Sequence, residues 1–344
     1  MNFATELLAK AGATDSEAQV VANSLVQANL RGHDSHGVMR IPFYVGRVQA
    51  GVLKPDSKLT IVTESSAAAM VCDGGWGFGQ VLSRELMALL IVKSSEVGIA
   101  LGTLRRSAHI GRLGEYAEMA AEQGKSALIC ANTHGAAQRV SPVGGKRPRL
   151  GTNPLCIGMP GGKGGPFILD FGTSATAEGK VRVKRIAGES VPAGWILDPN
   201  GNPTTDPNQL YGDPPGTILP MGGDQAYKGF GLAFMIEMLS GALSGGQCAD
   251  PAMPPAIGNC ATFIVIDPEH FAGSEFLRKE IAGLEEYVRN VPLIDETKTV
   301  ILPGDPERRV LAERSESGIP IDDGNWKALI QLAEELNVDP PKIS

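Results

Sequence analysis

Apolar side chains recur at the three- and four-residue spacing of a helix through the first fifty residues. They predict helices over 2–11 and 38–50, with a third helix between them. Thr14 and Glu17, three residues apart, form a capping box that marks where the middle helix begins. Pro42 falls in the first turn of the last helix, where proline is tolerated. The chain therefore begins with a helical region.

The pattern changes near Lys58, where short apolar or alternating runs bounded by glycines replace the helical spacing. The segments 58–64 and 67–75 have the character of strands, and a long apolar helix is predicted over 78–97. Further strands and helices alternate over 99–104, 113–122, 126–132, 155–160 and 167–171. Such alternation is typical of a mixed α/β fold with one main sheet.

The second half of the chain combines the same elements with turns. The pattern predicts helices over 178–186, 228–243 (a buried helix), 274–289, from Glu307 onward, and from an Asp323 N-cap to Leu336. Strands are predicted over 261–268 and just before the turn 303–307. Turn-forming residues fill 198–207, and the polar, Pro-rich stretch 203–220 is the expected boundary or long crossing loop.

The composition is that of a globular protein, with 42% hydrophobic and 20% charged residues. A net charge of -7 without a long Lys/Arg run argues against nucleic acid and against an anionic membrane surface as partners. No apolar stretch reaches the ~18 residues of a spanning helix, and the chain start lacks the apolar core of a signal peptide. The 5 cysteines, without a C-x-x-C pair, fit a reducing compartment. We therefore expect a cytoplasmic protein.

Several common nucleotide-binding and hydrolase motifs are missing. The run 75–79 approaches the G-x-G-x-x-G dinucleotide fingerprint, but Gln80 occupies the place of the third glycine. The GKS run 124–126 has Met119 where a P-loop needs glycine, and neither G-x-S-x-G nor H-E-x-x-H occurs. These absences exclude the routine NTPase, α/β-hydrolase and zinc-protease interpretations. They leave dehydrogenase chemistry on another fold open.

The segment 31–40 gathers the residues that proton and anion chemistry needs. Oxidising a secondary alcohol requires a group that takes the hydroxyl proton, and histidine, with a pKa of roughly 6.5, suits that exchange. The planar fork of an arginine binds a carboxylate bidentately. His36 and Arg40 are four residues apart at the start of a helix, so both can face one pocket. Ser35 can hydrogen-bond the substrate or fix the imidazole tautomer.

Two other interpretations explain the same segment. One is a polar helix cap, with His36 a satisfied surface residue and Arg40 a solvated charge. The other is a metal site, because His33 and His36 form an H-x-x-H pair with Asp34 between them. A metal-dependent hydrolase built on these three residues is therefore a hypothesis from a different class.

Three further residues are candidates for a site. His109 lies between a strand and a helix. It can be a second acid/base, a cofactor contact or an ordinary turn histidine. Asp170 ends a strand, where it can accept hydrogen bonds from ribose hydroxyls or cap a helix. Lys228 begins a helix, where the dipole does not favour a cation, and this favours a functional role.

Seven stretches, in order, together resemble the malate/L-lactate dehydrogenase family that is unrelated to the Rossmann-fold lactate and malate dehydrogenases. They are RGHDSHGVMRIPFY, SAHIGRLGEYA, GTNPLCIGMP, ILDFGTSATAEGK, PAGWILDPNGNPTTDP, GGDQAYKGFGLAFMIEMLSGALSG and PGDPE, and they span Arg31 to Glu307. Relatives in this family include sulfolactate, ureidoglycolate and diketogulonate oxidoreductases and piperideine-2-carboxylate reductase.

The resemblance implies a family-specific, non-Rossmann α/β fold with two domains. A helical substrate domain is expected from both chain ends, over 1–70, 208–260 and 290–344. A mixed-sheet domain for the nicotinamide cofactor is expected over 71–207 and 261–289. The resemblance also implies a homodimer with its active site near the subunit interface.

The resemblance assigns roles to individual residues as well. By match to the motif S-H-G-x-x-R, His36 is the proton donor or acceptor, Ser35 its helper and Arg40 the carboxylate clamp. His109 matches a histidine that has the acid/base role in some relatives, and we keep both histidines while favouring His36. Thr152 is expected to approach the substrate. The cofactor, NAD or NADP, is expected to contact Thr133, Asp170, Phe171, Gly172, Thr173, Ser174, Lys228, Gly304, Asp305 and Pro306.

Two segments depart from the family pattern. The form S-N-H-F-G reads SAHIG over 107–111, which puts the pocket near His109 in question. Where the family has the turn PGE, this chain has PGDPE over 303–307. This difference puts the last expected cofactor contact in question. Arg182, Lys184 and Arg185 could bind the 2′-phosphate of NADP, or form the solvated face of a helix.

The sequence thus predicts an NAD(P)-dependent oxidoreductase with a small carboxylate substrate and no metal. It transfers a hydride between nicotinamide and a 2-hydroxy or 2-oxo carboxylic acid. The alternatives are a reductase of cyclic imines, such as piperideine- or pyrroline-2-carboxylate, and the metal-dependent hydrolase.

Overall fold

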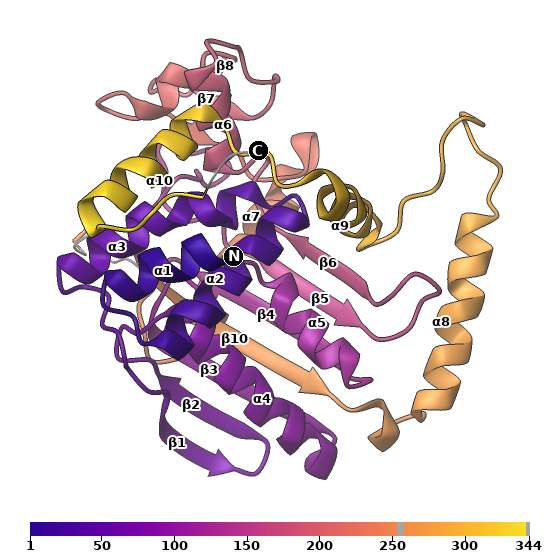
Figure 1. Cartoon of the computed structure of the whole chain (residues 1–344). Coiled ribbons are helices and arrows are strands. Elements are labelled where there is room, and N and C mark those ends of the chain that lie inside the picture. Colours follow the sequence, from indigo (N-terminus) through magenta and orange to yellow (C-terminus); the bar gives the residue numbers. More distant parts are fainter. Residues whose placement is uncertain (253–257, 342–344) are drawn as a thin grey trace.

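A seven-stranded sheet forms the centre of the protein in a computed structural model that describes residues 1–252 and 258–341 (Figure 1). The strand order is β1-β2-β3-β10-β4-β5-β6. The strands are β1 Thr60–Ser66, β2 Ala69–Asp73, β3 Ile99–Ala108, β4 Ser126–Asn132, β5 Leu155–Met159, β6 Phe167–Phe171 and β10 Gly258–Ile266. This confirms the prediction of a mixed α/β fold with one main sheet.

The middle of the sheet is formed by the strand that comes last in the chain. β10 pairs antiparallel with β3 on one side and with β4 on the other. Only β2 and β3 run parallel, and the remaining neighbours are antiparallel. β10 is apolar almost throughout, because both faces of the sheet are covered at its centre.

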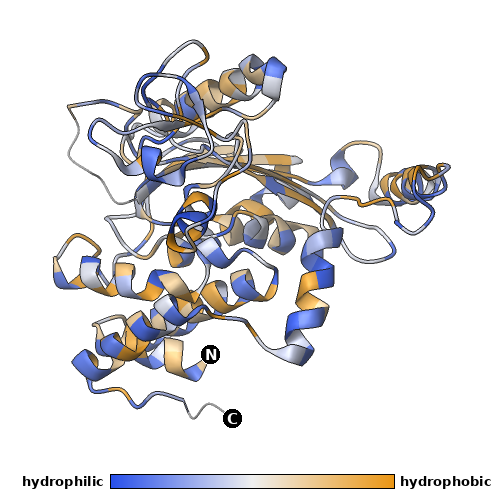
Figure 2. Ribbon diagram, turned by 90° about the horizontal axis from the view of Figure 1, so that it is seen from above, coloured by the Kyte–Doolittle hydropathy of each residue, from blue (hydrophilic) through white to orange (hydrophobic). Residues whose placement is uncertain are grey.

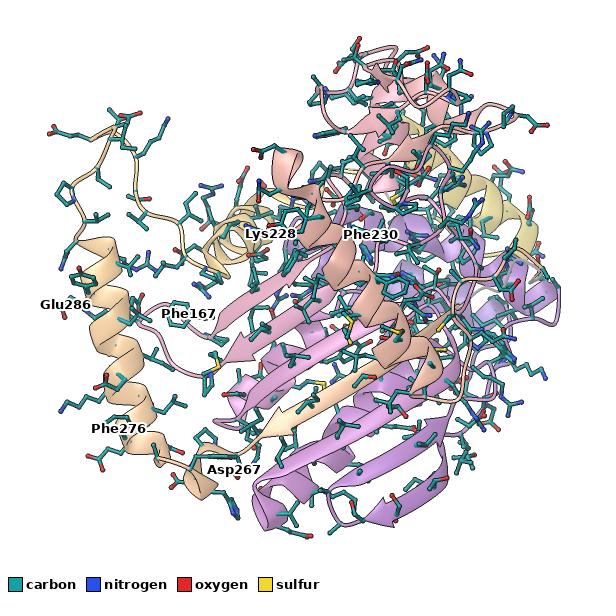
Figure 3. All side chains as sticks on the ribbon, turned by 180° about the vertical axis from the view of Figure 1, so that it is seen from behind. Phe167, Lys228, Phe230, Asp267, Phe276 and Glu286 are labelled. Atoms are coloured by element: carbon teal, nitrogen blue, oxygen red, sulfur yellow. The ribbon has the colours of Figure 1, made fainter. Side chains whose placement is uncertain are left out.

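Helices cover both faces of this sheet. α4 (Gly79–Val97) and α5 (Gly114–Glu122) lie on the face toward the viewer in Figure 1. Their buried side chains form one core with the strands, in which Tyr116 packs edge-on against Phe263 at 5.6 Å between ring centroids. α7 (Ala226–Glu237) crosses the opposite face, over β4 (Figure 3).

Both ends of the chain contribute to a second core. α1 (Asn2–Lys10), α2 (Asp15–Leu30), α3 (Ile41–Gln49) and α10 (Asp323–Leu336) bury their apolar sides against one another. The capping box is present, since the Thr14 side chain accepts from the Glu17 N–H and Glu17 bonds back to the Thr14 N–H. The last helix is capped by Asp322, one residue before the predicted Asp323. The division into two domains stays a prediction.

A small third core lies where turns and a crossing loop were predicted. β7 (Ile196–Leu197), β8 (Pro203–Thr204) and β9 (Thr217–Ile218) form a second sheet beside α6 (Glu178–Ile186) and the 3₁₀ turn Pro207–Tyr211. Ile196, Leu210 and Ile218 are fully buried there. Isolated apolar residues between prolines and glycines thus anchor a compact unit, which local turn composition does not reveal.

The segment after β10 stands apart from the rest of the chain. α8 (Ser274–Arg289) is the outlying helix in Figure 1 and is viewed end-on in Figure 2. The strand predicted before the turn 303–307 is absent from the described structure, because 299–302 has no neighbouring strand to pair with. α9 begins at Asp305, two residues before the predicted Glu307, and ends at Ser317. No helix among the described residues has the length and apolar character needed to span a membrane.

The segment 228–243 was predicted as a buried helix. The prediction is wrong for one side of the helix, which is exposed. α7 passes into a π-helical turn over Met238–Ala242, and only one side of both elements faces the sheet. Apolar side chains on the other side are 37–57% exposed, and we call them the α7 apolar face: Tyr227, Phe234, Met235, Met238, Leu239 and Leu243. An apolar sequence alone does not say whether its own chain covers it.

Candidate active site

The segment 31–40 connects α2 to α3 through two 3₁₀ turns, η1 (Asp34–His36) and η2 (Val38–Arg40). The Asn29 side chain fixes both turns, since its Nδ2 donates to Asp34 Oδ1 at 2.7 Å and its Oδ1 accepts from the Val38 N–H at 2.8 Å. Gly37 lies so close to Asn29 that a Cβ would come 2.1 Å from Oδ1. A side chain at this position would therefore displace the bracing amide.

A contact from the other end of the chain holds the same turn. Arg314 of α9 binds both carboxylate oxygens of Asp34, at 2.6 and 3.1 Å. Sequence reasoning did not identify Asn29 or Arg314. Arg314 is 280 positions away from Asp34, so no local pattern could link them.

The structure places the two candidate histidines together. The rings of His36 and His109 stack with centroids 5.3 Å apart and an interplanar angle of 29°. The Ser35 hydroxyl lies 2.9 Å from His36 Nδ1. Burial, assisted by the positive charge of Arg40 and then by His33 and Arg112, lowers the pKa of His36 to about 3. His36 is therefore a neutral imidazole at ordinary pH and is able to accept a proton.

His109 is held by residues that the sequence did not suggest. The Tyr44 hydroxyl lies 2.7 Å from His109 Nδ1, and Gln80 Nε2 donates to that hydroxyl at 2.9 Å. The Gly111 N–H also donates to Nδ1, at 3.3 Å. Burial, with Arg40 and His36 nearby, lowers the pKa of His109 well below its usual value. Tyr44 follows Arg40 by four residues, so helical spacing was a signal for it.

Arg40 completes this group. Its Nε donates to the Ser35 carbonyl at 2.7 Å, which fixes the guanidinium beside the histidines. Among residues 1–252 and 258–341, neither of its terminal nitrogens has a hydrogen-bond or ion-pair partner. A carboxylate is the partner that such a fork binds. The expected trio of Ser35, His36 and Arg40 thus lies in one place, with His109 added.

A second group lies where the two ends of the connection from β4 to β5 meet the loop after β6. The Thr173 N–H and hydroxyl both donate to the Thr152 carbonyl, at 2.9 and 3.0 Å. Thr133 approaches the Gly151 backbone so closely that a Cβ there would lie 2.9 Å from its methyl group. Of the remaining residues predicted in this run, Phe171 ends β6, Gly172 packs against Thr152, and Ser174 Oγ donates to the Thr176 carbonyl at 2.8 Å.

These loops rest on a buried acid that the sequence did not single out. Glu237 of α7 accepts from Asn132 Nδ2 and from Asn153 Nδ2, both at 2.7 Å. Asn132 directly precedes Thr133 and Asn153 directly follows Thr152. The two loops therefore keep a fixed spacing. The Ser35 side chain packs against α6, since a Cβ on Gly179 would lie 3.3 Å from the Ser35 Cβ.

Asp170 lies where both of its predicted roles remain open. Its Oδ2 accepts from the N–H of Gly114, the first residue of α5, at 2.7 Å, as a helix cap would. Its Oδ1 has no partner in the described part of the chain. Burial raises the pKa of Asp170 against the opposing effects of His33, the Gly114 N–H and Arg112.

The turn 303–307 lies beside His33, whose Nε2 is 3.4 Å from Glu307 Oε1. Gly304 has a φ of 90° and leads into α9. Asp305 bonds to Arg289 at 2.9 Å and to Arg308 at 2.6 Å, so its oxygens are already engaged. Pro306 occupies the first turn of α9. A cavity of about 140 Å³ adjoins this turn, lined in part by Arg31, Glu118, Gly304, Glu307 and Arg308.

The Lys228 side chain has no hydrogen bond or ion pair to this group among the described residues. It lies in the first turn of α7 (Figure 3), with its exposed amine 5.8 Å from the Tyr227 ring centroid. The connection to the loops is indirect, because Gly229 packs on Met221, whose N–H donates to the Thr173 carbonyl at 3.0 Å.

Two of the three basic residues considered for the 2′-phosphate have local partners. Lys184 pairs with Glu189, and the Arg185 guanidinium lies 4.5 Å from the Tyr211 ring centroid. For Lys184 and Arg185 this is the arrangement of a solvated helix face. No group of three His, Cys, Asp or Glu side chains placed to hold a metal occurs in the described ranges, so the hydrolase hypothesis lacks a site there.

Known proteins are similar to this chain in both sequence and fold. The sequence profile of the malate/L-lactate dehydrogenase family matches residues 1–330. Hydroxycarboxylate dehydrogenase B of Escherichia coli (strain K12) is 39% identical over 341 residues, which cover 98% of this chain and 92% of that protein. The chain therefore belongs to the malate/L-lactate dehydrogenase family and is an oxidoreductase of the dehydrogenase type.

Solved structures agree with this result. A putative malate/lactate dehydrogenase from E. coli superposes with a TM-score of 0.91 at 38% identity, covering 98% of this chain and 94% of that one. The delta1-piperideine-2-carboxylate reductase from Pseudomonas syringae pvar. tomato gives a TM-score of 0.83 at 30% identity, with 96% and 97% covered. The resemblance identified from the sequence motifs is confirmed.

Proposed function

We propose that this protein transfers a hydride between NAD or NADP and a small 2-hydroxy or 2-oxo carboxylic acid. The observation that carries the proposal is the Arg40 guanidinium, held by its Nε alone beside two neutral histidines. Its free terminal nitrogens suit the substrate carboxylate. The histidines then face the neighbouring carbon, which bears the hydroxyl or keto oxygen.

In the oxidation direction His36 takes the hydroxyl proton while the hydride leaves the same carbon. His36 is suited to this step because its lowered pKa leaves it unprotonated before substrate binds. The Ser35 hydroxyl can hydrogen-bond His36 in either protonation state, because a hydroxyl both donates and accepts. In the reverse direction His36 returns the proton to the keto oxygen.

The chain has groups that fit a nicotinamide dinucleotide. Asp170 has an oxygen without a partner among the described residues, suited to a ribose hydroxyl, and Thr133, Thr152, Thr173 and Ser174 bring further hydroxyl groups on the neighbouring loops. The cavity beside Gly304 offers space for a further part of the cofactor. When bound, the nicotinamide supplies or accepts the hydride. Phe171, Gly172, Lys228, Asp305 and Pro306 keep their proposed role as cofactor contacts.

A second candidate is the reduction of a cyclic imine that carries a carboxylate. The likeness to the piperideine-2-carboxylate reductase favours it, since that relative shares the fold at 30% identity. Arg40 would bind the same carboxylate, and His36 would give its proton to the imine nitrogen.

We further propose that the protein is a homodimer. The α7 apolar face supports this, because soluble monomers rarely leave a contiguous apolar patch of that extent uncovered. A second copy of the chain is the partner to which we assign the face.

A turnover assay tests the proposed reaction. Purified protein is mixed with NADH or NADPH and a panel of 2-oxo acids and cyclic imines, and the reduced-nicotinamide absorbance is followed, with His36→Ala as the matched variant. We expect turnover of one acceptor, lost in the variant, and a rise in melting temperature with cofactor. Absence of both turnover and stabilisation would contradict the proposal.

A further inference from the structure

A buried chain of hydrogen bonds leads from α4 to His109. Gln80 is fully buried, Tyr44 is nearly so, and Tyr44 lies between Gln80 Nε2 at 2.9 Å and His109 Nδ1 at 2.7 Å. Nothing in the turnover scheme above requires Tyr44 or Gln80. Their contacts nevertheless end on one ring nitrogen of a histidine in the active site.

The Gly111 N–H fixes the direction of this chain. A backbone N–H can only donate, and it points at His109 Nδ1 from 3.3 Å. Nδ1 must therefore present its lone pair. The Tyr44 hydroxyl then donates its hydrogen to Nδ1, and its oxygen accepts from Gln80. Gln80 Oε1 has no partner in the described structure, so the amide itself does not impose a direction.

A neutral imidazole with an unprotonated Nδ1 carries its hydrogen on Nε2. Protonating Nδ1 would turn an N–H toward the Gly111 N–H and would force Tyr44 to give up its donor role. His36 has no such constraint, because the Ser35 hydroxyl can reverse. Protonation of the second ring nitrogen therefore disrupts the hydrogen bonds around His109 but not the hydrogen bond of His36 to Ser35.

We infer that Tyr44 and Gln80 are positioning residues that, together with the Gly111 N–H, hold His109 as the Nε2–H tautomer, so that His109 donates a hydrogen bond to the reacting oxygen while His36 alone exchanges the proton. The inference rests on the proposed function for the identity of that oxygen. His36, Arg40 and Tyr44 face His109, and none of them carries a negative charge that would stabilise a protonated ring. These neighbours therefore favour a neutral His109. Glu115, the acid near Tyr44, is bound to Ser24 and Arg84.

Nitrogen-15 NMR of histidine-labelled protein reads the tautomer without any substrate. The chain has only 5 histidines, and His109→Gln identifies the signals of His109. We expect wild-type Nδ1 at the shift of an unprotonated ring nitrogen and Nε2 at that of a protonated one. Tyr44→Phe leaves only the long Gly111 contact on Nδ1 and should therefore give a mixture of tautomers. The matched control, Thr262→Val, removes another buried hydroxyl, which bonds to the Leu239 carbonyl, and should leave the His109 signals unchanged.

Kinetics of glutamine variants then test the role. The glutamine amide can replace an Nε2–H donor but cannot exchange a proton, so His109→Gln should keep at least tenfold more activity than His109→Ala. His36→Gln should be as inactive as His36→Ala. Tyr44→Phe should lower kcat on the order of tenfold to a hundredfold, by analogy with the outer hydrogen-bond partners of metal-bound histidines.

The outcomes separate this inference from the proposed function. A proton on Nδ1 in the wild-type spectrum overturns the inference, even if the enzyme reduces a 2-oxo acid. Equal loss in His109→Gln and His109→Ala overturns the donor role. Absence of any turnover contradicts the proposed function, and the spectrum still decides the tautomer.

Discussion

Arg40 differs from Arg31, Arg112 and Arg314 in having no acidic partner. Among the described residues, these three arginines each bind an acid within about 3 Å, whereas the hydrogen bond of Arg40 goes to the Ser35 carbonyl. Its charge is therefore available and also acts on its neighbours, where it helps to lower the pKa of His36 and of His109. One side chain thus both binds the proposed substrate and sets the protonation state of the histidines.

Replacing Arg40 with lysine should weaken binding of carboxylate substrates. Lysine keeps the charge but loses the planar fork, and one charge-assisted hydrogen bond of about 1.5–3 kcal/mol corresponds to roughly a 10- to 100-fold rise in KM. The measurement is KM for a 2-oxo acid and for its carboxamide. The carboxamide should show little change, and Arg47→Lys on α3 is the control. An equal rise for acid and amide would show that Arg40 does not bind the carboxylate.

The pKa of His36 predicts the pH dependence of hydroxy-acid oxidation. Oxidation needs neutral His36, and a pKa lowered to about 3 keeps this form dominant as the pH falls through the ordinary histidine value. We expect kcat/KM for oxidation to have no acidic limb near pH 6.5, with loss only at lower pH. Circular dichroism at each pH verifies folding. A limb near pH 6.5 in a folded enzyme would mean that His36 is not the proton acceptor.

Reduction needs the opposite state of the same residue. A bound carboxylate cancels the charge of Arg40, which after burial is the next cause of the lowered pKa of His36, and so raises that pKa. Binding of a 2-oxo acid together with reduced cofactor should therefore take up a proton. Calorimetry in two buffers of different ionisation enthalpy measures this uptake, and identical apparent enthalpies in both buffers would contradict it.

Among the elements, the two 3₁₀ turns that carry Ser35, His36 and Arg40 depend on a contact from α2. Asn29 is buried and supplies two hydrogen bonds to the turns. Asn29→Ala should lower the free energy of unfolding by about 1–3 kcal/mol and also reduce kcat. Thr14→Ala, at the other end of α2, should cost about 1 kcal/mol through loss of the cap and leave kcat unchanged. Urea unfolding and turnover measure both, and unchanged kcat in Asn29→Ala would contradict the bracing role.

Local elements of the fold were predictable because their signals are local. Periodicity identified α2 with its capping box, the long helix α4 and the buried strands β4 and β10 within a few residues. The motif around His36 and the histidine at 109 were found for the same reason, since the chemistry is carried by residue type and spacing.

Features that depend on tertiary contacts were not predictable. The small sheet of β7, β8 and β9 is held by a cluster of six buried apolar residues scattered between Val140 and Ile218. The strand expected before the turn 303–307 has the right sequence but no strand beside it. Gln80 and Arg314 reach the site only after folding brings α4 and α9 to it.

For the whole molecule, the α7 apolar face is the largest departure from expectation. Its exposed side chains follow one side of a helix whose other side seals the sheet. Because Glu237 of the same helix fixes the loops of Thr133 and Thr152, an assembly that covers α7 would also restrain the site.

Introducing a charge into this face should separate the subunits. We expect wild-type protein at twice the chain mass of 36.1 kDa by sedimentation velocity. Phe234→Asp or Leu239→Asp should shift it toward the single-chain mass, because a carboxylate would lose its hydration in the interface. Ile186→Asp, on exposed α6, is the control. A dimer that survives both α7 substitutions would require a different interface.

The position of β10 has a consequence for synthesis of the chain. β3 and β4 are made early, yet neither meets its central neighbour until residues 258–266 have been translated. Until then the nascent protein presents two unpaired strand edges, which are surfaces prone to pair with other chains. Closing the sheet also requires contacts of large sequence separation, which slow folding. Ribosome pausing or premature release just before this strand should therefore increase aggregation more than the same event just after it.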